Sequence, residues 1–375
     1  MVTIERVTSR AGMNEFLAFP AKVYGNDAAW VPPLREWQQR RLSPKNPFFK
    51  EATLETFVAR RGKDPVGTIS ALRDPRWESQ KNEKASFFGF FETIDDPEVA
   101  AALIGAAEER ARSWGMEILR GPRNLTRIED VGITVEGHDK VPPLLASHHP
   151  PYYQRLVEGL GFEKHHDVLA YDIDLNLPDG SPRPLPPALQ AKADAVDMTG
   201  IEIRRARYRT LSADLRAAHH VFSEAFKTVP DTYPIPLDQF LNLGRALIAF
   251  TSRDMMQLVF LNGEPIAFAI CVPEMNEAIR YAHGKLFPVG WARFVEGLRH
   301  VNTASFKLIG VIPEHRKSGI HAKMIEHVIQ GLRVAGYGRL EASLIDERNG
   351  PMRNVVEGCG MTIYRRYRIY DRRIG

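Results

Sequence analysis

The chain has only two cysteines among its 375 residues, Cys271 and Cys359. Two thiols cannot build the disulfide framework of a small secreted domain or a cysteine-rich zinc site, and they suggest a reducing compartment. Long hydrophobic runs are also missing. Apolar stretches such as residues 266–272 are far shorter than the roughly 20 residues that span a bilayer. We therefore expect neither a disulfide-stapled protein nor a membrane span.

The chain also has no large excess of positive or negative charge. Lysine and arginine number 50 against 46 acidic residues, which gives a net charge of +4. Basic residues alternate with tyrosine at 364–368, a pattern that can bind nucleic acid but is also typical of a half-exposed terminal strand. Because the charges nearly balance, we expect no nucleic-acid partner. A mildly basic surface suits an anionic cofactor equally well.

The first residues, Met-Val-Thr-Ile-Glu-Arg, carry a charge pair where a secretory signal would have its apolar core. We therefore expect a cytoplasmic protein, one that can still lie at the periphery of a membrane.

The clearest break in the chain is a proline-rich stretch at residues 177–188, which contains five prolines. Such a stretch favours an extended spacer over a helix or a central strand. We place a linker at 177–199 between domains at 1–176 and 200–375. Both halves follow one order, which is strand, helices, three strands, helix, strand, helix, strand. This order predicts a duplicated α/β fold built on a mixed sheet.

The segment with the clearest chemistry follows the buried strand at 304–311. Arg316 and Lys317 supply positive charge, Ser318 can cap the next helix, and Gly319 allows an anion close to the backbone. The helix that starts directly after Gly319 adds the partial positive charge of its dipole. We interpret the segment as an anion cradle; the alternative is a solvated basic turn between a strand and a helix.

This segment resembles the pyrophosphate loop of the GNAT superfamily of acyl-CoA N-acyltransferases, Arg/Gln-x-x-Gly-x-Gly/Ala. The family's preceding strand commonly ends in Val-x-Pro-Glu-x-Arg, and this chain has Val-Ile-Pro-Glu-His-Arg at 311–316. The loop then departs from the family at its sixth position, where His321 replaces Gly or Ala. The resemblance implies acetyl-CoA or a longer acyl-CoA as donor. The cofactor-binding residues that it implies here are Ile309, Gly310, Val311, Arg316, Lys317, Ser318, Gly319, Ile320 and His321.

A second match to the family lies downstream. Asn349 stands eleven residues before Gly360, the spacing of the family's asparagine that opens the last helix. The resemblance implies that Asn349 contacts the pantetheine arm of CoA or fixes the adjacent loop; a plain helix cap is the alternative. The family's tyrosine that protonates the departing thiolate is replaced by Val356.

The resemblance implies direct transfer of the acyl group to an amine. The splayed strand that ends at 309–311 would pair with the pantetheine amides and polarise the thioester carbonyl. A base is needed because an alkylammonium is mostly charged at pH 7. Glu341 is our candidate for this catalytic base, with Asp346 and Glu347 behind it. Each of these carboxylates could instead be an ordinary solvated group.

The first half resembles the family in outline only, because its loop position holds Thr-Ile-Asp-Asp-Pro at 93–97. Two aspartates would repel a pyrophosphate, so we expect no CoA site there. This half would instead help to shape the acceptor pocket, with residues 30–33, 46–49 and 148–153. The whole chain is similar to bacterial tandem-GNAT proteins with a degenerate N-terminal half. Loop residues packed on a core are the alternative reading of these features.

We therefore expect an N-acyltransferase whose acceptor is a small-molecule amine, including large, amphiphilic or lipid-like ones. The alternative is a non-catalytic GNAT-fold protein that binds CoA or another ligand as a scaffold or sensor. We expect no metal. The histidine pairs at 148–149, 165–166 and 219–220 are adjacent residues, whose side chains point apart on strands and helices. The oligomeric state is open.

Overall fold

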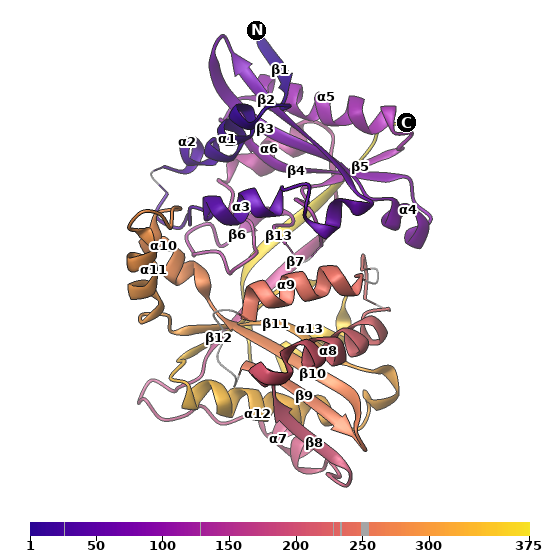
Figure 1. Ribbon diagram of the computed structural model, residues 1–375, viewed down its shortest axis with the longest axis vertical. Helices are drawn as coiled ribbons and strands as arrows, with labels where there is room; N and C mark the ends of the chain where they lie inside the picture. Colours follow the sequence, from indigo (N-terminus) through magenta and orange to yellow (C-terminus); the bar gives the residue numbers. More distant parts are fainter. Residues whose placement is uncertain (26, 128, 228, 233–234, 249–254) are drawn as a thin grey trace. The chain divides into compact units, whose positions relative to one another are not determined.

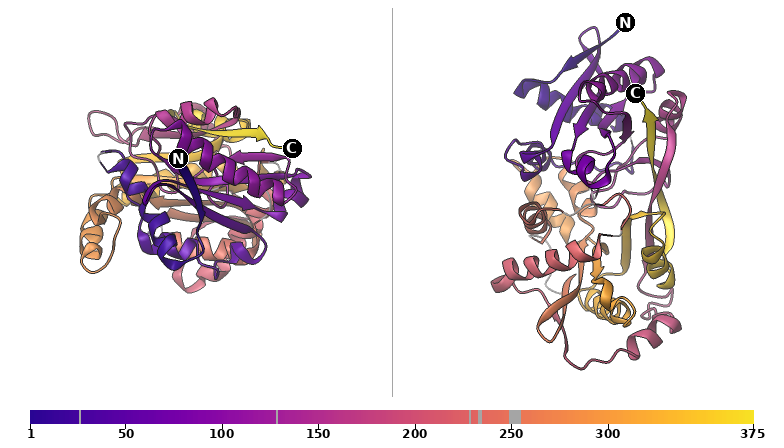
Figure 2. Two further views of the ribbon diagram at one scale, coloured as in Figure 1. Left: turned by 90° about the horizontal axis from the view of Figure 1, so that it is seen from above. Right: turned by 90° about the vertical axis from the view of Figure 1, so that its right-hand side faces the viewer.

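A computed structural model of the chain describes residues 1–25, 27–127, 129–227, 229–232, 235–248 and 255–375 (Figure 1). The chain forms two compact units. The first consists of Met1–Leu169, Ile279–Val295 and Tyr364–Gly375, and the second of Ala170–Ala278 and Glu296–Ile363. Both ends of the chain therefore belong to the first unit (Figure 2).

The first unit contains an N-terminal group of helices, a sheet and two helices that follow its central strands. Its elements are β1 (Val2–Arg6), α1 (Arg10–Ala18), α2 (Pro20–Tyr24), α3 (Arg35–Arg41), η1 (Pro47–Lys50), β2 (Thr53–Arg61), β3 (Asp64–Arg73), α4 (Pro75–Lys81), β4 (Ala85–Thr93), α5 (Pro97–Ser113), β5 (Ile118–Gly121), β6 (Ile133–Glu136) and α6 (Tyr152–Gly159). Residues of both units occur in β7 (Glu163–Asp174), α10 (Met275–Ala282), α11 (Gly290–Leu298) and β13 (Thr362–Arg373).

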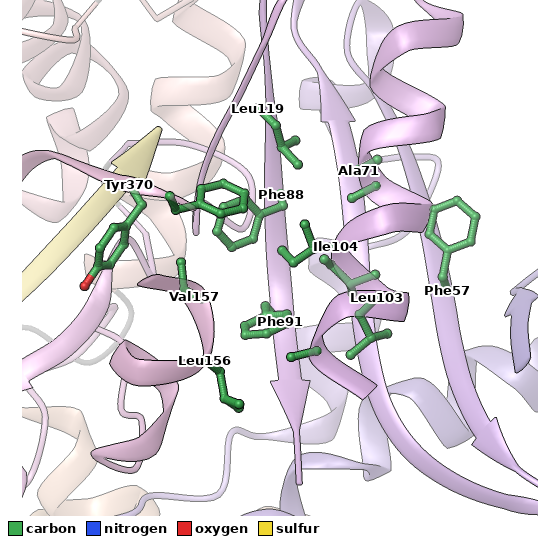
Figure 3. Packing of buried hydrophobic residues seen from close by; sticks show 14 of the residues in the cluster. Phe57, Ala71, Phe88, Phe91, Leu103, Ile104, Leu119, Leu156, Val157 and Tyr370 are labelled. Carbon is green, nitrogen blue, oxygen red and sulfur yellow. The ribbon is translucent and has the colours of Figure 1, made fainter. Parts of the chain in front are cut away.

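The core of the first unit lies between α5 and the sheet (Figure 3). Helix α5 starts where the sequence predicts, because Asp96 caps it by accepting from the Glu98 amide and Pro97 occupies its first turn. Its apolar residues recur every three or four positions, so Leu103 and Ile104 face the sheet. There they join the buried aromatic residues of β4, such as Phe88.

The last strand of the chain completes the sheet of the first unit. Its order is β1-β2-β3-β4-β5-β13, and β6 also pairs with β13. Strand β13 runs antiparallel to β5, with Tyr370 opposite Gly121. Tyr370 and Ile374 are buried in the core of this unit. The compact units therefore differ from the expected division of the chain, since residues 279–295 and 364–375 group with the first unit.

The second unit has the same strand pattern as the first. Its elements are α7 (Pro187–Asp194), β8 (Ile201–Arg205), η2 (Tyr208–Thr210), α8 (Leu211–Ala225), α9 (Leu237–Ile248), β9 (Met256–Leu261), β10 (Glu264–Pro273), β11 (Thr303–Val311), η4 (Pro313–His315), α12 (Ile320–Val334), β12 (Arg339–Asp346) and α13 (Gly350–Gly358). The sheet order is β12-β11-β10-β9-β8, with β11 and β12 parallel and the other pairs antiparallel. In the first unit β4 and β5 are the matching parallel pair. The expectation of a duplicated α/β fold on a mixed sheet is confirmed.

The predicted linker at 177–199 is not extended throughout, because α7 forms within it. Pro187 occupies the first turn of this helix, where a missing N–H costs nothing. Leu189 and Ala193 are buried, and the Gln190 amide donates to Glu326 of α12 over 3.0 Å. The segment expected to be a spacer therefore covers part of the second unit.

Candidate functional site

Strands β11 and β12 separate at the middle of the second unit. Their parallel pairing runs from Thr303 opposite Arg339 to Phe306 opposite Ala342, and no later pair occurs among the described residues. Strand β11 nevertheless continues to Val311 and stays paired with β10 on its other side. The backbone of residues 307–311 therefore has an edge that β12 does not cover. This is the splayed strand that the family resemblance implies.

A β-bulge marks the point of separation. The register between β10 and β11 passes from Cys271–Phe306 to Ile270–Leu308, so Lys307 is an extra residue on β11. A bulge re-aims the side chains around it. The ammonium group of Lys307 donates to the Ser343 hydroxyl on β12 over 3.2 Å. The gap between the two strands is therefore spanned by polar side chains at this point.

The predicted base, Glu341, lies at the same place. Its side chain is buried, its Oε2 accepts from the Ser305 hydroxyl, and the Lys307 ammonium lies 3.7 Å from that oxygen. Burial raises the pKa of the Glu341 carboxyl, and Lys307 opposes that rise. The other oxygen, Oε1, is buried without a hydrogen bond in the described structure. That atom is the one with capacity to accept a proton.

Behind Glu341, Asp346 is not available as a base. It is completely buried, and Arg348 donates to both of its carboxylate oxygens over 2.9 and 2.7 Å. Such a bidentate pair engages both oxygens of the carboxylate. The structure thus favours Glu341 over Asp346.

The expected anion loop joins β11 to α12. Gly319 has a φ of +80° directly before the helix, and a Cβ at this position would lie 2.9 Å from the Lys192 carbonyl oxygen. Both facts require glycine here. The Ser318 hydroxyl accepts from the Ile320 amide over 3.3 Å and donates to the His315 carbonyl over 2.8 Å. The Ser318 hydroxyl therefore accepts from the first amide of the helix, as the sequence predicts, and Gly319 has the left-handed conformation that favours glycine.

The basic residues of the loop have different surroundings. The Arg316 guanidinium donates to the carbonyl oxygens of Ala225 over 2.7 Å and Val311 over 3.4 Å, so it braces the loop against the end of α8. Lys317 is exposed at the loop surface. His321 is half-buried in the first turn of α12, and burial together with the charge of Lys192 lowers its pKa. Burial therefore favours the neutral form of His321, whereas Arg316 and Lys317 are exposed cations of the loop.

Asn349 caps the helix that follows β12. Its side-chain oxygen accepts from the Met352 amide over 3.3 Å at the start of α13. This is the capping role that the sequence offered as an alternative. Val356, at the position of the family's tyrosine, is buried and carries no titratable group. The contact of Asn349 with pantetheine stays a prediction.

Two strands of the first unit separate in the same way, but a loop of the same unit pairs with the edge that is freed. Strands β4 and β5 pair from Ala85–Ile118 to Phe87–Arg120 and then diverge. The Arg123 amide donates to the Phe88 carbonyl over 2.8 Å, and the Asn124 side chain accepts from the Phe90 amide over 2.6 Å. Residues 123–124 therefore cover the edge of β4. The corresponding edge of β11 in the second unit is uncovered. The contact of residues 123–124 with β4 supports the expectation that the first half binds no CoA.

Nothing in the sequence indicates that the first unit holds an acidic residue with a perturbed pKa. Glu92, on β4, accepts at Oε2 from the hydroxyls of Tyr24 over 2.5 Å and Tyr153 over 2.9 Å. Burial raises the pKa of Glu92 to about 7, against an ordinary value of 4.5. Nearby, the His148 imidazole lies 2.7 Å from an Asp27 carboxylate oxygen. The pattern at 148–153 pointed to this region, but nothing local linked it to residues 24 and 92.

No family model matches the chain. It is 32% identical over 371 residues to Protein YghO of Escherichia coli (strain K12), which covers 96% of this chain and 93% of that protein. It is 29% identical over 374 residues to the Bacterial ceramide synthase of Caulobacter vibrioides (strain NA1000 / CB15N), which covers 98% of this chain and 96% of that protein. Both alignments extend over nearly the whole of each chain.

Solved structures share the fold at low sequence identity. A tandem GNAT protein from the clavulanic acid biosynthesis pathway matches with a TM-score of 0.55 and 14% identity, over 100% of this chain and 99% of that one. A GCN5-related N-acetyltransferase from Sphaerobacter thermophilus matches with a TM-score of 0.53 and 14% identity, over 100% and 96%. These likenesses concern the arrangement of the backbone in both halves.

Proposed function

Because the chain belongs to the GNAT superfamily, as a tandem member related over its length to Protein YghO, we propose that it is an acyl-CoA-dependent N-acyltransferase whose second unit binds the donor. The observation that carries the proposal is the uncovered edge of β11 beside a buried carboxylate. That edge ends in the loop whose Gly319 opens α12.

The uncovered backbone and the loop suit the two parts of CoA. Residues 307–311 can pair with the amides of pantetheine, as an added strand would. The start of α12 offers backbone N–H groups and the positive end of the helix dipole to a pyrophosphate. Lys317 adds a full charge at the loop surface. The same positions of the first unit are occupied by Arg123 and Asn124, which supports the second unit as the donor site.

The chemistry requires a proton acceptor and a leaving group. The amine nitrogen attacks the thioester carbonyl, a C–N bond forms, the C–S bond breaks, and CoA departs as a thiolate. Glu341 takes the proton of the amine at Oε1, directly or through water, and water or the acceptor itself protonates the thiolate. Val356 cannot supply that second proton. The reaction gains mainly from holding donor and acceptor in line.

For the acceptor we propose a long-chain amino alcohol, with a fatty acyl-CoA as donor. The Caulobacter relative is a bacterial ceramide synthase by name, and the alignment with it covers 98% of this chain. An amide between a fatty acid and a long-chain amino alcohol is what that name denotes. Acetyl transfer to a small polar amine is the competing version of the same activity.

Calorimetric titration of CoA and of acetyl-, octanoyl- and palmitoyl-CoA tests donor binding. Lys317→Glu reverses a charge at the loop, and Lys45→Glu makes the same reversal at an exposed site in the first unit. We expect about a ten-fold or greater loss of affinity for Lys317→Glu and none for Lys45→Glu. Absence of binding by every thioester at high micromolar concentration would overturn the proposal.

The second candidate is a scaffold that binds acyl-CoA without turnover, which the buried Val356 and the half-buried His321 favour. A turnover assay with palmitoyl-CoA and a long-chain amino alcohol separates the two. Release of free thiol that depends on both substrates supports the enzyme. Binding without thiol release, over a panel of long-chain and short polar amines, supports the scaffold.

A further inference from the structure

A short segment of the first unit, residues 281–295, carries an unusual share of the exposed apolar surface. Large apolar side chains in the segment are exposed by 43% to 71% at Tyr281, Phe287, Val289, Trp291 and Val295. Nine such side chains are exposed among the described residues of the whole chain, so five of them fall within fifteen residues. Single exposed apolar residues need no explanation, but five within one short segment favour an interaction site.

The segment is held in place. The Arg280 guanidinium donates to the Ala28 carbonyl over 3.1 Å, and the Arg35 amide donates to the Gly284 carbonyl over 3.1 Å. A Cβ on Gly284 would lie 2.9 Å from the Cβ of Pro32, so the two loops are in close contact. Phe294 is buried. These contacts hold the backbone that carries the exposed side chains. The segment includes the end of α10 and most of α11, which are drawn in orange in Figure 1.

Helix α11 separates its side chains by face. Trp291 and Val295 are four residues apart and lie on the same side of the helix, both exposed. Phe294 lies on the inward side and is 5% exposed. Helix α11 thus presents an apolar stripe outward in addition to the one that it buries.

The charge of the segment has one sign. Residues 281–295 contain no aspartate or glutamate, while Lys285 and Arg293 are exposed and form no ion pair with a described residue. Aromatic rings beside uncompensated cations suit the headgroup region of an anionic bilayer. There tryptophan and tyrosine lie at the interface, and lysine and arginine face anionic lipid.

We propose that residues 281–295 dock on the surface of an anionic lipid bilayer. We call these residues the 281–295 patch. Among the described residues, none of the helices combines the length and the apolar composition of a membrane span. Two exposed cations with no carboxylate in residues 281–295 favour an anionic surface over a second copy of the same patch. The proposal does not depend on the acyltransferase activity, because binding to lipid can be measured without turnover.

Flotation of the full chain with vesicles tests the proposal. We expect the protein to float with vesicles of phosphatidylcholine and phosphatidylglycerol, less so with phosphatidylcholine alone, and less at high salt. Phe287→Ser with Trp291→Ser should weaken binding at least ten-fold. Val334→Ser, at an 81% exposed site on α12, should leave binding unchanged.

A second variant guards against misfolding of the first. Lys285→Gln with Arg293→Gln keeps the apolar side chains and should lower binding to anionic vesicles by about five-fold for each lost charge. Failure of the wild type to float with anionic vesicles, or flotation that both variants leave unchanged, would overturn the proposal. So would a wild-type dimer that Trp291→Ser dissociates, if it binds no lipid, because the patch would then join two copies. Titration of CoA into the patch variants, expected to match the wild type, keeps this result separate from that of the acyltransferase proposal.

Discussion

The ammonium nitrogen of Lys307 lies 3.7 Å from the Oε2 of Glu341, where β11 and β12 separate. Lys307 is the extra residue of the bulge, so the same irregularity opens the sheet and brings a cation to the buried carboxylate. Burial favours the protonated carboxyl, and the cation favours the ionised one. A carboxylate balanced in this way can both take up and release a proton.

Replacement of Glu341 by glutamine tests its role as the base. Glutamine keeps the shape and the hydrogen bond from Ser305 but cannot accept a proton from the amine. We expect kcat to fall about 10²-fold or more while the affinity for acyl-CoA is kept. Glu264→Gln, at an exposed carboxylate of the same unit, should leave kcat unchanged. Equal turnover by Glu341→Gln would remove Glu341 from the mechanism.

Gly319 and Gly336 form a matched pair for the geometry of the loop. Both have positive φ, +80° and +87°, but a Cβ meets the Lys192 carbonyl oxygen only at Gly319. Gly336→Ala should lower the free energy of unfolding by about 1 kcal/mol, the cost of the left-handed conformation. Gly319→Ala should cost about 2–3 kcal/mol, because the close contact is added. Urea unfolding of the two variants measures the difference. Equal losses of unfolding free energy would mean that α7 shifts to accommodate the added Cβ at no cost.

Asn349 allows a test that separates capping from donor binding. Asn349→Ala removes the acceptor for the Met352 amide and should cost about 1 kcal/mol of stability, whereas Asn349→Asp keeps it. If Asn349 also contacts pantetheine through its amide N–H, Asn349→Asp should weaken acyl-CoA binding with no loss of stability. Unchanged affinity in Asn349→Asp would leave the residue as a cap alone. Calorimetry and thermal unfolding of both variants give the two readouts.

Glu92 should make the stability of the first unit depend on pH. Its pKa is about 7 in the folded chain and near 4.5 when unfolded, so folding favours the protonated form. The stabilisation is complete below about pH 4.5 and is lost as the pH rises through 7. One unit of pKa corresponds to about 1.4 kcal/mol. Thermal unfolding between pH 5 and 8 should therefore show a decline in the wild type that is flatter in Glu92→Gln; parallel curves would contradict this.

The loop before α12 could be predicted because its determinants are neighbours in sequence. A buried strand, basic residues, Ser318 and Gly319 lie within a few positions, and the family resemblance covers the same residues. The splay of β11 followed from that resemblance. The surroundings of Glu92 could not be predicted, because Tyr24 and Tyr153 reach it from 68 and 61 residues away. Local patterns set helices and strands, but they do not show which distant side chains meet.

The hydrogen bonds of two loop residues, Arg316 and Asn124, could not be predicted from sequence patterns either. Arg316 was expected to add charge for an anion, yet its guanidinium is directed at two backbone carbonyls, because the end of α8 lies beside the loop. Asn124 accepts from the Phe90 amide at the edge of β4, which no sequence pattern of the first half indicates. Contacts of this kind depend on the path of loops, and the sequence constrains loops least.

The pairing of β13 with β5 bears on how the protein is made. Residues 364–375 leave the ribosome after every residue of the second unit, yet Tyr370 and Ile374 belong to the core of the first. During synthesis the edge of β5 in the first unit therefore stays unpaired until these residues have been translated. An exposed strand edge invites pairing with other chains. The nascent chain is thus most vulnerable to aggregation over the whole time that the second unit takes to emerge.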